Sequence, residues 1–266
     1  MRNLILFLVL SVLVLLAGCA TNPITGKREL MLVSSSKEMQ IGRQYAPEIE
    51  KQLGNRIQNA EIQSYIASVG AKIAKVSHMP GRSFTFTALN DESVNAMALP
   101  DGSIYITRGM LENMSTEAQL ASVLAHEATH VTARHVSSAM SRQIGIDLLL
   151  SVISSKTEMG AISQSVANYG RQIVNLKFSR NDELEADLGG LNYMLKAGYD
   201  PHAFIEVMEI LDAQSKTKQI EFLSSHPLPA SRKQELKMRI EAKRLPKGLK
   251  VGKAKYKSNV LDKLAK

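Results

Sequence analysis

The pentapeptide His-Glu-Ala-Thr-His at residues 126–130 restricts this chain more than any other feature of its sequence. In a helix of about 3.6 residues per turn, His126 and His130 project one above the other and can share a single ion. Two imidazoles suit Zn²⁺, which proteins bind through nitrogen, sulfur and carboxylate ligands. Glu127 lies about 100° around the helix, close enough to act as a base on water without being a ligand. The pentapeptide therefore predicts a helix that supplies part of a metal site.

The residues around the pentapeptide favour a buried helix. Residues 123–125 and Val131 are uncharged, and the helical pattern that opens at residue 116 continues to about residue 140. On one continuous helix, His135 would lie about 180° from His126. We therefore expect His135 to stay outside the site.

A catalytic zinc site needs a third protein ligand and an open fourth position, and an acidic stretch at residues 182–187 offers candidates. Glu183 and Asp187 share one face of a predicted helix. A carboxylate buried beside apolar residues is costly unless it is neutralised, and a metal ion neutralises it. We expect Glu183 to be the third ligand, Asp187 to accept a hydrogen bond from the outer nitrogen of a ligating His, and Glu185 to face solvent. Taken alone, the stretch is also an ordinary acidic helix start.

The N-terminal residues indicate export. Arg2 precedes an apolar run over residues 4–16, which is the layout of a secretory signal peptide. This run is about 13 residues long, short of the roughly 20 that a membrane-spanning helix needs. It leads into Leu-Ala-Gly-Cys at residues 16–19, which resembles the lipobox of bacterial lipoproteins. We expect residues 1–18 to be a signal peptide and residues 19–35 a lipid-attached segment.

Cys19 is the residue that would carry the lipid. It is the only cysteine, so the mature chain has no disulfide and no cysteine metal site. Three acyl chains would anchor the chain far more firmly than one. Because Ala20 follows the cysteine instead of Asp, analogy favours the outer membrane of a Gram-negative cell, facing the periplasm. The alternative is an ordinary signal peptide that is cut nearby, with Cys19 an incidental thiol.

Patterns along the rest of the chain predict a mostly helical α+β domain over residues 36–245, with one small sheet and no second domain. Residues 84–89 alternate as a strand does, and residues 96–99 and 104–107 flank an Asp-Gly turn that predicts a β-hairpin. The apolar residues 144–153 are too few to span a membrane and predict a core or hairpin helix. Further helices are expected at residues 36–53, 60–76, 163–175, 182–196, 201–213 and 230–243.

The net charge of +8 comes from the C-terminal end. Residues 232–266 hold 13 Lys and Arg against 3 Asp and Glu, so residues 246–266 form a basic tail. The tail is either a solvated, partly disordered end or a segment that rests on an anionic surface such as lipid. Nucleic acid is not an expected partner, because the compartment outside the cytoplasm contains little of it.

Two motifs together resemble a known family. The second motif is Glu183-x-x-Ala-Asp187, which starts 53 residues after His130 and follows Ser179-Arg180. With the pentapeptide, it resembles the motifs of the CAAX-prenyl-protease/HtpX-type zinc metallopeptidases, in their soluble bacterial lipoprotein branch. The resemblance covers roughly residues 21–243 and implies a gluzincin fold, with a small sheet over the pentapeptide helix. It extends to Asn95-Ala96-Met97-Ala98-Leu99-Pro100 and to Ser225-His226-Pro227 with Arg232.

The resemblance implies a zinc-dependent endopeptidase with one Zn²⁺ per chain on His126, His130 and Glu183, and with Glu127 as general base. Imidazole and carboxylate ligands in this fold favour zinc over Mn²⁺ or Fe²⁺. Family descriptions also give Asp187 a proton-donor role. Three interpretations of His226 stay open. It stabilises the oxyanion with Arg232 orienting it or the substrate, it occupies the open position and holds the enzyme latent, or it is a loop histidine without function.

Residues Asn95, Ala96, Met97 and Ala98 match the edge strand of the family, along which an extended substrate pairs. The alternative is an ordinary buried hairpin strand. Pairing through the backbone implies extended, misfolded or misassembled envelope proteins as substrates, and hence envelope quality control. Two rival functions are a non-enzymatic or latent periplasmic chaperone on the same scaffold and a metal-binding lipoprotein for zinc supply, which would leave Glu127 idle. The sequence does not identify the physiological substrate or the oligomeric state.

Overall fold

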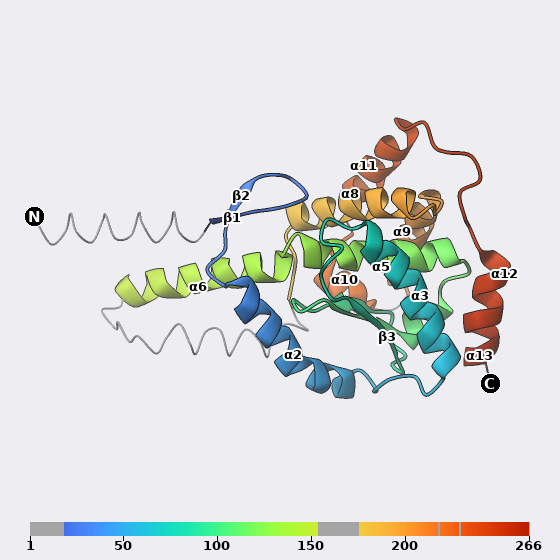
Figure 1. Cartoon of the computed structure of the whole chain (residues 1–266), viewed down its shortest axis with the longest axis horizontal. Helices are drawn as coiled ribbons and strands as arrows, with labels where there is room; N and C mark the ends of the chain where they lie inside the picture. Colours follow the sequence, from blue (N-terminus) through green and yellow to red (C-terminus); the bar gives the residue numbers. More distant parts are fainter. Residues whose placement is uncertain (1–18, 154–175, 218, 229, 266) are drawn as a thin grey trace, which may run out of the picture.

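Helix α5 (Glu117–Thr132) lies at the centre of the fold, and all of its residues are buried (Figure 1). Three other helices pack against it: α3 (Ala60–Val76), α8 (Arg180–Lys196) and α9 (His202–Ser215). The computed structural model describes residues 19–153, 176–217, 219–228 and 230–265. The expected signal peptide at 1–18 and the expected helix at 163–175 lie outside these residues. The described chain is mostly helical with small sheets, as the sequence predicts.

A three-stranded sheet covers α5 next to α3. It contains β3 (Thr85–Leu89), β4 (Ala96–Ala98) and β5 (Ser103–Thr107) in the order β3-β5-β4, with β3 parallel and β4 antiparallel to β5. The predicted hairpin is confirmed: Leu99 N donates to Ser103 O at 2.7 Å, and Gly102 has the positive φ of 102° that glycine adopts readily in such turns. The sheet order puts β4 at an edge.

The remaining elements surround this core (Figure 1). An antiparallel pair of short strands, β1 (Cys19–Thr21) and β2 (Arg28–Leu30), forms the N-terminal hairpin, residues 19–30. The hairpin lies beside α6. The other elements are α2 (Ser35–Gln52), α4 (Arg108–Glu112), α6 (His135–Ile153), α10 (Glu221–Ser225), α11 (Ala230–Glu241), α12 (Lys253–Tyr256), the π-helix η2 (Lys257–Leu261) and α13 (Asp262–Leu264).

A glycine pair lets α8 approach α5 closely. A Cβ atom at Gly189 would lie 2.5 Å from Thr129 Cγ2, and one at Gly190 would lie 3.2 Å from His126 N. Glycine inside a helix costs about 1 kcal/mol relative to alanine. The close packing of the two helices that carry the pentapeptide and the acidic stretch offsets that cost.

The expectation of one continuous helix from residue 116 to 140 is wrong. The chain breaks between α5 and α6, where Arg134 adopts a left-handed φ of 59°. This conformation is uncommon for a residue other than glycine, and two contacts hold it: Arg134 Nε donates to Glu38 Oε2 at 2.8 Å, and Nη2 donates to Val33 O at 3.0 Å. Because of the break, His135 does not follow the helix geometry that the sequence suggests.

The expected partial disorder of the basic C-terminal end is wrong for its described part, which folds into α12, η2 and α13. Tyr256 and Val260 are fully buried, and Tyr256 Oη donates to Leu111 O at 2.7 Å. Ala118 N, at the start of α5, donates to Val251 O at 3.0 Å. The segment folds back over the N-terminal end of α5, while its lysines stay largely exposed.

A membrane-spanning helix requires both length and a nearly uncharged apolar sequence. Within the described ranges, no helix meets both requirements.

Candidate metal centre

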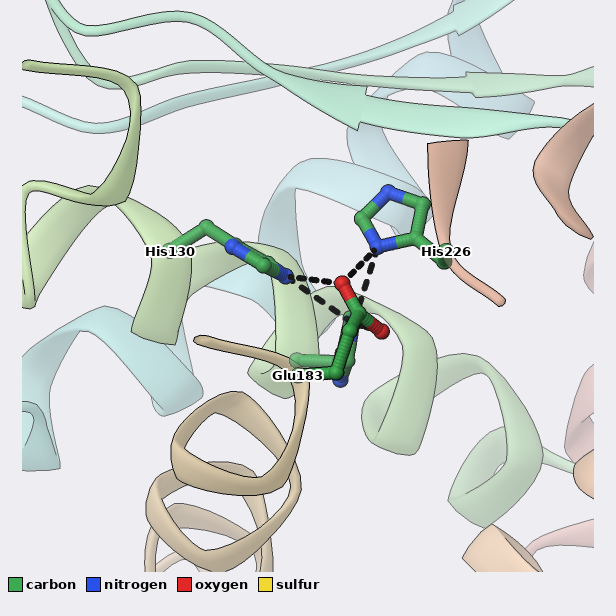
Figure 2. A group of neighbouring side chains, drawn as sticks. His130, Glu183 and His226 are labelled. Carbon is green, nitrogen blue, oxygen red and sulfur yellow. Dashed lines mark hydrogen bonds and ion pairs between the residues drawn. The ribbon is translucent and has the colours of Figure 1, made fainter. Parts of the chain in front are cut away.

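Four buried side chains from three parts of the chain converge beside α5 (Figure 2). His126 and His130 come from α5, Glu183 comes from the first turn of α8, and His226 follows α10. One ligand atom from each lies within 4.8 Å of the other three. The cluster contains the three residues that the sequence predicts as ligands, together with His226, for which a place at the open position was one of three interpretations.

Distances within the cluster are short. His126 Nε2 and His130 Nε2 lie 3.1 Å apart, and Glu183 Oε1 lies 3.4 Å from His130 Nε2. His226 Nδ1 lies 2.8 Å from Glu183 Oε1 and 3.3 Å from His126 Nε2. Each of the four side chains exposes at most 2% of its surface. Nitrogen and carboxylate donors thus face one another in a space that is closed to solvent.

Two features of the cluster fit a bound cation. Both carboxylate oxygens of Glu127 are buried and have no hydrogen-bond partner among the residues that the structure describes, although buried polar groups in proteins are nearly always paired. The donor set of imidazole nitrogens and one carboxylate is the set that zinc prefers. A cation, together with water between it and Glu127, would satisfy these groups.

Local sequence explains how α8 presents Glu183. Ser179 caps the helix, since its Oγ accepts from Asp182 N at 3.2 Å while Asp182 Oδ2 accepts from Ser179 N at 3.0 Å. This reciprocal capping box fixes where the helix begins. It therefore fixes the turn from which Glu183 reaches the histidines.

Burial and charge shift the titration of these groups in different directions. Burial raises the pKa of Glu127 and lowers the pKa of His130 well below its ordinary value, which favours the neutral ring that a metal ligand must be. Burial also favours a raised pKa for Glu183, but His226 and His130 outweigh it and hold that pKa well below the ordinary range. Burial opposes protonation of His226, yet the carboxylates of Glu183 and Glu127 raise its pKa.

Asp187 and Arg232 lie directly behind the cluster. Asp187 Oδ1 is 3.1 Å from His126 Nδ1, a ring nitrogen that makes no hydrogen bond in this conformation. Arg232 holds Asp187 through two hydrogen bonds, lies 2.5 Å from Glu183 Oε2, and donates to the carbonyl of Pro227 at 2.7 Å. Its guanidinium therefore contacts the two acidic residues and the backbone after His226.

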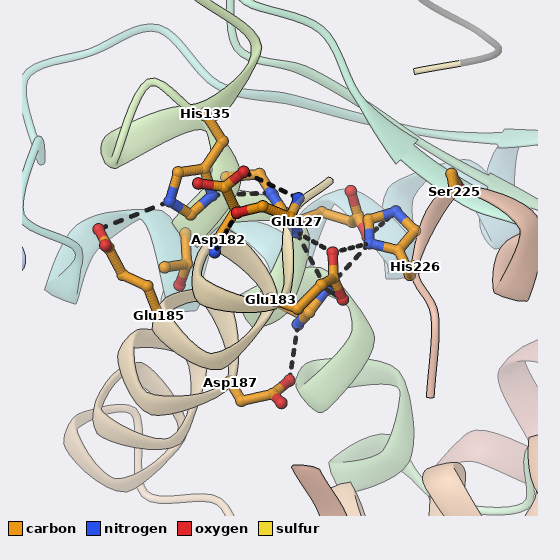
Figure 3. Close-up of polar contacts among 12 residues, drawn as sticks. Glu127, His135, Asp182, Glu183, Glu185, Asp187, Ser225 and His226 are labelled. Atoms are coloured by element: carbon orange, nitrogen blue, oxygen red, sulfur yellow. Dashed lines mark hydrogen bonds and ion pairs between the residues drawn. The ribbon is translucent and has the colours of Figure 1, made fainter. Parts of the chain in front are cut away.

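Two residues that the sequence appeared to exclude from the site lie near it: His135 contacts His130, and Glu185 contacts His135 (Figure 3). His135 Nδ1 is 2.9 Å from His130 Nδ1, so the expectation that His135 lies far from the site is wrong. Glu185 was expected to be solvated, but its side chain is only 13% exposed and its Oε1 lies 3.5 Å from His135 Nε2. The cause is the break at Arg134, for which the sequence offers neither glycine nor proline as a signal.

The expected substrate strand lies at the sheet edge but is not exposed. Asn95, Ala96, Met97 and Ala98 each expose 9% of their surface or less. Phe222 N of α10 donates to Val94 O at 3.1 Å, just before β4. The segment that carries His226 thus contacts the chain that leads into this strand.

A cavity of about 780 Å³ lies away from the cluster. It lies between the N-terminal hairpin, α6 and α8, where it is lined by Lys27, Arg142, Glu185 and Leu188 among others. A much smaller apolar space of about 20 Å³ adjoins His126 and His226, roughly the room that one water molecule needs. In this conformation a peptide cannot reach the cluster without a movement of His226 or its neighbours.

Comparison with known proteins agrees with the motifs and the geometry. Residues 60–240 match the sequence model of peptidase family M48. The chain is similar to the beta-barrel assembly-enhancing protease of Escherichia coli (strain K12), at 30% identity over 80% of this chain and 45% of the relative. It is also similar to the mitochondrial metalloendopeptidase OMA1 of Schizosaccharomyces pombe, at 30% identity over 77% of this chain and 61% of the relative.

A third relative matches along most of its length. The metalloprotease LoiP of Escherichia coli (strain K12) is 25% identical over 89% of this chain and 96% of the relative. The chain spans about half the length of the beta-barrel assembly-enhancing proteases, so their whole-protein properties do not transfer directly. On the family match, which covers the sheet, the pentapeptide and the acidic stretch, the chain belongs to peptidase family M48, a family of metallopeptidases.

Proposed function

We propose that this chain is a zinc-dependent endopeptidase in which His126, His130 and Glu183 hold the ion. The observation that carries the proposal is the convergence of these three side chains in one buried cluster, with the unpaired carboxylate of Glu127 beside it. When bound, zinc would supply a Lewis acid that activates water and polarises the substrate carbonyl. Membership of peptidase family M48 supports the same reaction class.

Glu127 is the proposed general base. Its carboxylate takes the proton of the attacking water and later delivers it to the nitrogen of the departing peptide. Its burial, which raises its pKa, suits a group that must both accept and return a proton near neutral pH. Asp187 orients His126 from behind, and its pairing with Arg232 makes it a poor proton donor to the substrate.

His226 is the proposed latch of a latent state. Its Nδ1 belongs to the four-residue cluster, and its other nitrogen lies 3.8 Å from Glu127 Oε1. A ring in this position competes with water and substrate for the fourth position that a catalytic zinc site needs. Release of His226 would open this fourth position to water and substrate.

The proposed substrates are extended polypeptides, namely unfolded or misassembled proteins of the bacterial cell envelope. The position of β4 at the sheet edge supports backbone pairing as the recognition mode. The name of one relative, the beta-barrel assembly-enhancing protease, fits such a role. The lipobox-like sequence ending at Cys19 supports an anchor in the outer membrane that faces the periplasm.

A second candidate function is a latent or non-enzymatic chaperone on a peptidase scaffold. The complete burial of the cluster favours it, because a site with 2% exposure or less does not receive substrate without rearrangement. The intact Glu127 argues against a scaffold that has lost its chemistry, since a purely structural zinc site has no need of a base.

One experiment separates these functions. Zinc content and cleavage of unfolded casein are measured for the wild-type chain and for Glu127→Gln, which keeps the shape of the side chain but cannot take up a proton. An endopeptidase loses cleavage in the variant and keeps its zinc. If the chain is a chaperone, the wild type and the variant prevent aggregation of an unfolded protein equally well, and neither of them cleaves casein. Cleavage by the variant at the wild-type rate would refute the proposed mechanism.

A further inference from the structure

We propose that His135 and Glu185 are positioning residues for the metal ligand His130, and that Asn22 ties the N-terminal hairpin to this pair. The inference rests on the proposed zinc site, but it concerns groups that lie outside the four-residue cluster. Together with His130, these three residues form a series of polar contacts. The first joins His130 to His135, the second joins His135 to Glu185, and the third joins Glu185 to Asn22.

The first contact fixes which nitrogen of His130 faces the ion. His130 Nε2 points into the cluster, where it lies 3.1 Å from His126 Nε2, while its Nδ1 lies 2.9 Å from His135 Nδ1. When Nε2 gives its lone pair to a metal, the ring proton must sit on Nδ1. That Nδ1–H then donates to His135 Nδ1, which serves as the acceptor.

The second contact determines which ring nitrogen of His135 carries the proton. Because His135 Nδ1 accepts, a neutral ring carries its proton on Nε2. This nitrogen is buried and makes no hydrogen bond within the described part of the chain, and Glu185 Oε1 faces it at 3.5 Å. A carboxylate in this place stabilises the Nε2–H tautomer, and a small shortening of the contact would complete the hydrogen bond.

Stacking keeps both rings in place. The ring of Phe178 packs against His130 with centroids 4.0 Å apart and contacts His135 with centroids 6.3 Å apart. The two histidines meet edge to face with centroids 4.8 Å apart. The rings therefore have little freedom to turn away from the series of contacts.

The third contact reaches the N-terminal hairpin. Asn22 is 1% exposed and donates from Nδ2 to Glu185 Oε1 at 2.6 Å and to Glu29 Oε1 at 2.8 Å. Its own position is fixed by the hairpin turn, because its Oδ1 accepts from Ile24 N at 2.9 Å and its backbone N–H donates to Lys27 O at 2.8 Å. The hairpin thus holds Glu185 in place against His135.

In this arrangement, each histidine of the pentapeptide has a carboxylate partner from α8. Asp187 faces the outer nitrogen of His126 directly, and Glu185 faces that of His130 through His135. Glu185 leaves α8 on the side opposite Glu183 and Asp187 (Figure 3), so the bend at Arg134 is what brings His135 within its reach. Partners of this kind orient a ligand ring and raise its basicity.

The test is the zinc affinity of the full chain, measured by competition with a chromophoric chelator. Loss of a partner behind a ligating histidine typically weakens metal binding by about 10–100-fold. We expect losses in that range for His135→Phe, which keeps a ring but no acceptor, and smaller losses for Glu185→Gln and Asn22→Ala. His135→Asn should restore part of the affinity, because its amide oxygen can accept from His130 Nδ1–H.

Glu29→Gln is the matched control. It changes the other carboxylate that Asn22 contacts and leaves the series intact, so its zinc affinity should equal that of the wild type. The melting temperature of each metal-free variant separates a loss of folding from a loss of metal affinity. Glu185→Gln keeps the inference testable if His135→Phe fails to fold.

Three results decide the matter. If His135→Phe and Glu185→Gln both bind zinc as tightly as the wild type, the inference is wrong. Because the residues act in series, the double variant should bind no more weakly than His135→Phe alone, and additive losses would contradict that arrangement. A wild-type chain that binds no zinc would refute the proposed function itself, whatever the variants do.

Discussion

The guanidinium of Arg232 holds both carboxylate oxygens of Asp187, with Nε 2.8 Å from Oδ2 and Nη2 2.7 Å from Oδ1. Both side chains are buried, Arg232 with 6% exposure and Asp187 with none. A planar guanidinium matches a carboxylate in this two-bond geometry better than a lysine does. The pair therefore fixes α11 to α8 and, through Asp187, fixes the carboxylate that faces His126.

Replacement of Arg232 should lower the free energy of unfolding much more than replacement of an exposed basic residue does. In Arg232→Gln, Asp187 stays buried without its cation, and loss of one partner of a buried pair typically costs about 3–5 kcal/mol. Urea unfolding measures the change in the free energy of unfolding. The neighbour Lys233 is the control: it is 37% exposed and lies 3.8 Å from Glu209, so Lys233→Gln should change stability by less than about 1 kcal/mol. Equal losses in the two variants would contradict a structural role for the Arg232–Asp187 pair.

Removal of His226 should raise peptidase activity. In His226→Ala, the fourth position is no longer contested, so we expect faster cleavage of casein at saturating zinc, together with weaker zinc binding because one donor is missing. The measurement is the initial rate of cleavage at a fixed zinc concentration. A lower rate in zinc-loaded enzyme would instead assign His226 to stabilisation of the transition state.

An added methyl group between α5 and α8 should disturb the metal site. In Gly189→Ala, the new Cβ would lie 2.5 Å from Thr129 Cγ2, so α8 must move away from α5 and carry Glu183 with it. Overpacking of this kind costs about 1–3 kcal/mol, and zinc affinity should fall as well. Gly145→Ala is the matched control within a helix: among the described residues, no atom lies within 4 Å of its Cβ position, so it should stabilise the chain by about 0.4–1 kcal/mol.

Glu117 should make stability depend on pH. Burial opposes its ionisation, but hydrogen bonds from Tyr199 at 2.7 Å, Tyr65 at 2.8 Å and Lys72 at 3.1 Å outweigh burial and lower its pKa below the ordinary 4.5. A group with a lowered pKa in the folded state stabilises the fold above its unfolded pKa, and this contribution disappears as the pH falls through the folded pKa. Glu117→Gln should therefore be less stable than the wild type at neutral pH by about 1.5–3 kcal/mol.

The difference between these two proteins should shrink as the pH falls below 4.5. Unfolding of the metal-free chains at several pH values measures it without interference from zinc. The exposed Glu112, 3.7 Å from Arg108, supplies the control, since Glu112→Gln should show no comparable pH dependence. A constant difference between wild type and Glu117→Gln at every pH would be incompatible with the lowered pKa.

Much of the fold follows from local pattern. The boundaries of α2, α3, α8, α9 and α11 lie within about two residues of their expected positions, and the Asp-Gly hairpin forms where the sequence predicts it. The elements that the sequence does not reveal are short or irregular, such as α10 and the helices that follow Gly252. They form because they contact the core, with Tyr256 as the buried anchor of the C-terminal segment.

The sequence by itself determined the pentapeptide helix and the shared face of Glu183 and Asp187, because helix periodicity acts over a few residues. Only the tertiary structure decided which distant groups meet. His226 lies 100 residues from His126 and Asn22 lies 163 residues from Glu185, separations over which no local pattern carries information. The left-handed bend at Arg134 also depends on the tertiary structure, because the contacts that stabilise it come from Glu38 and Val33, about a hundred positions away.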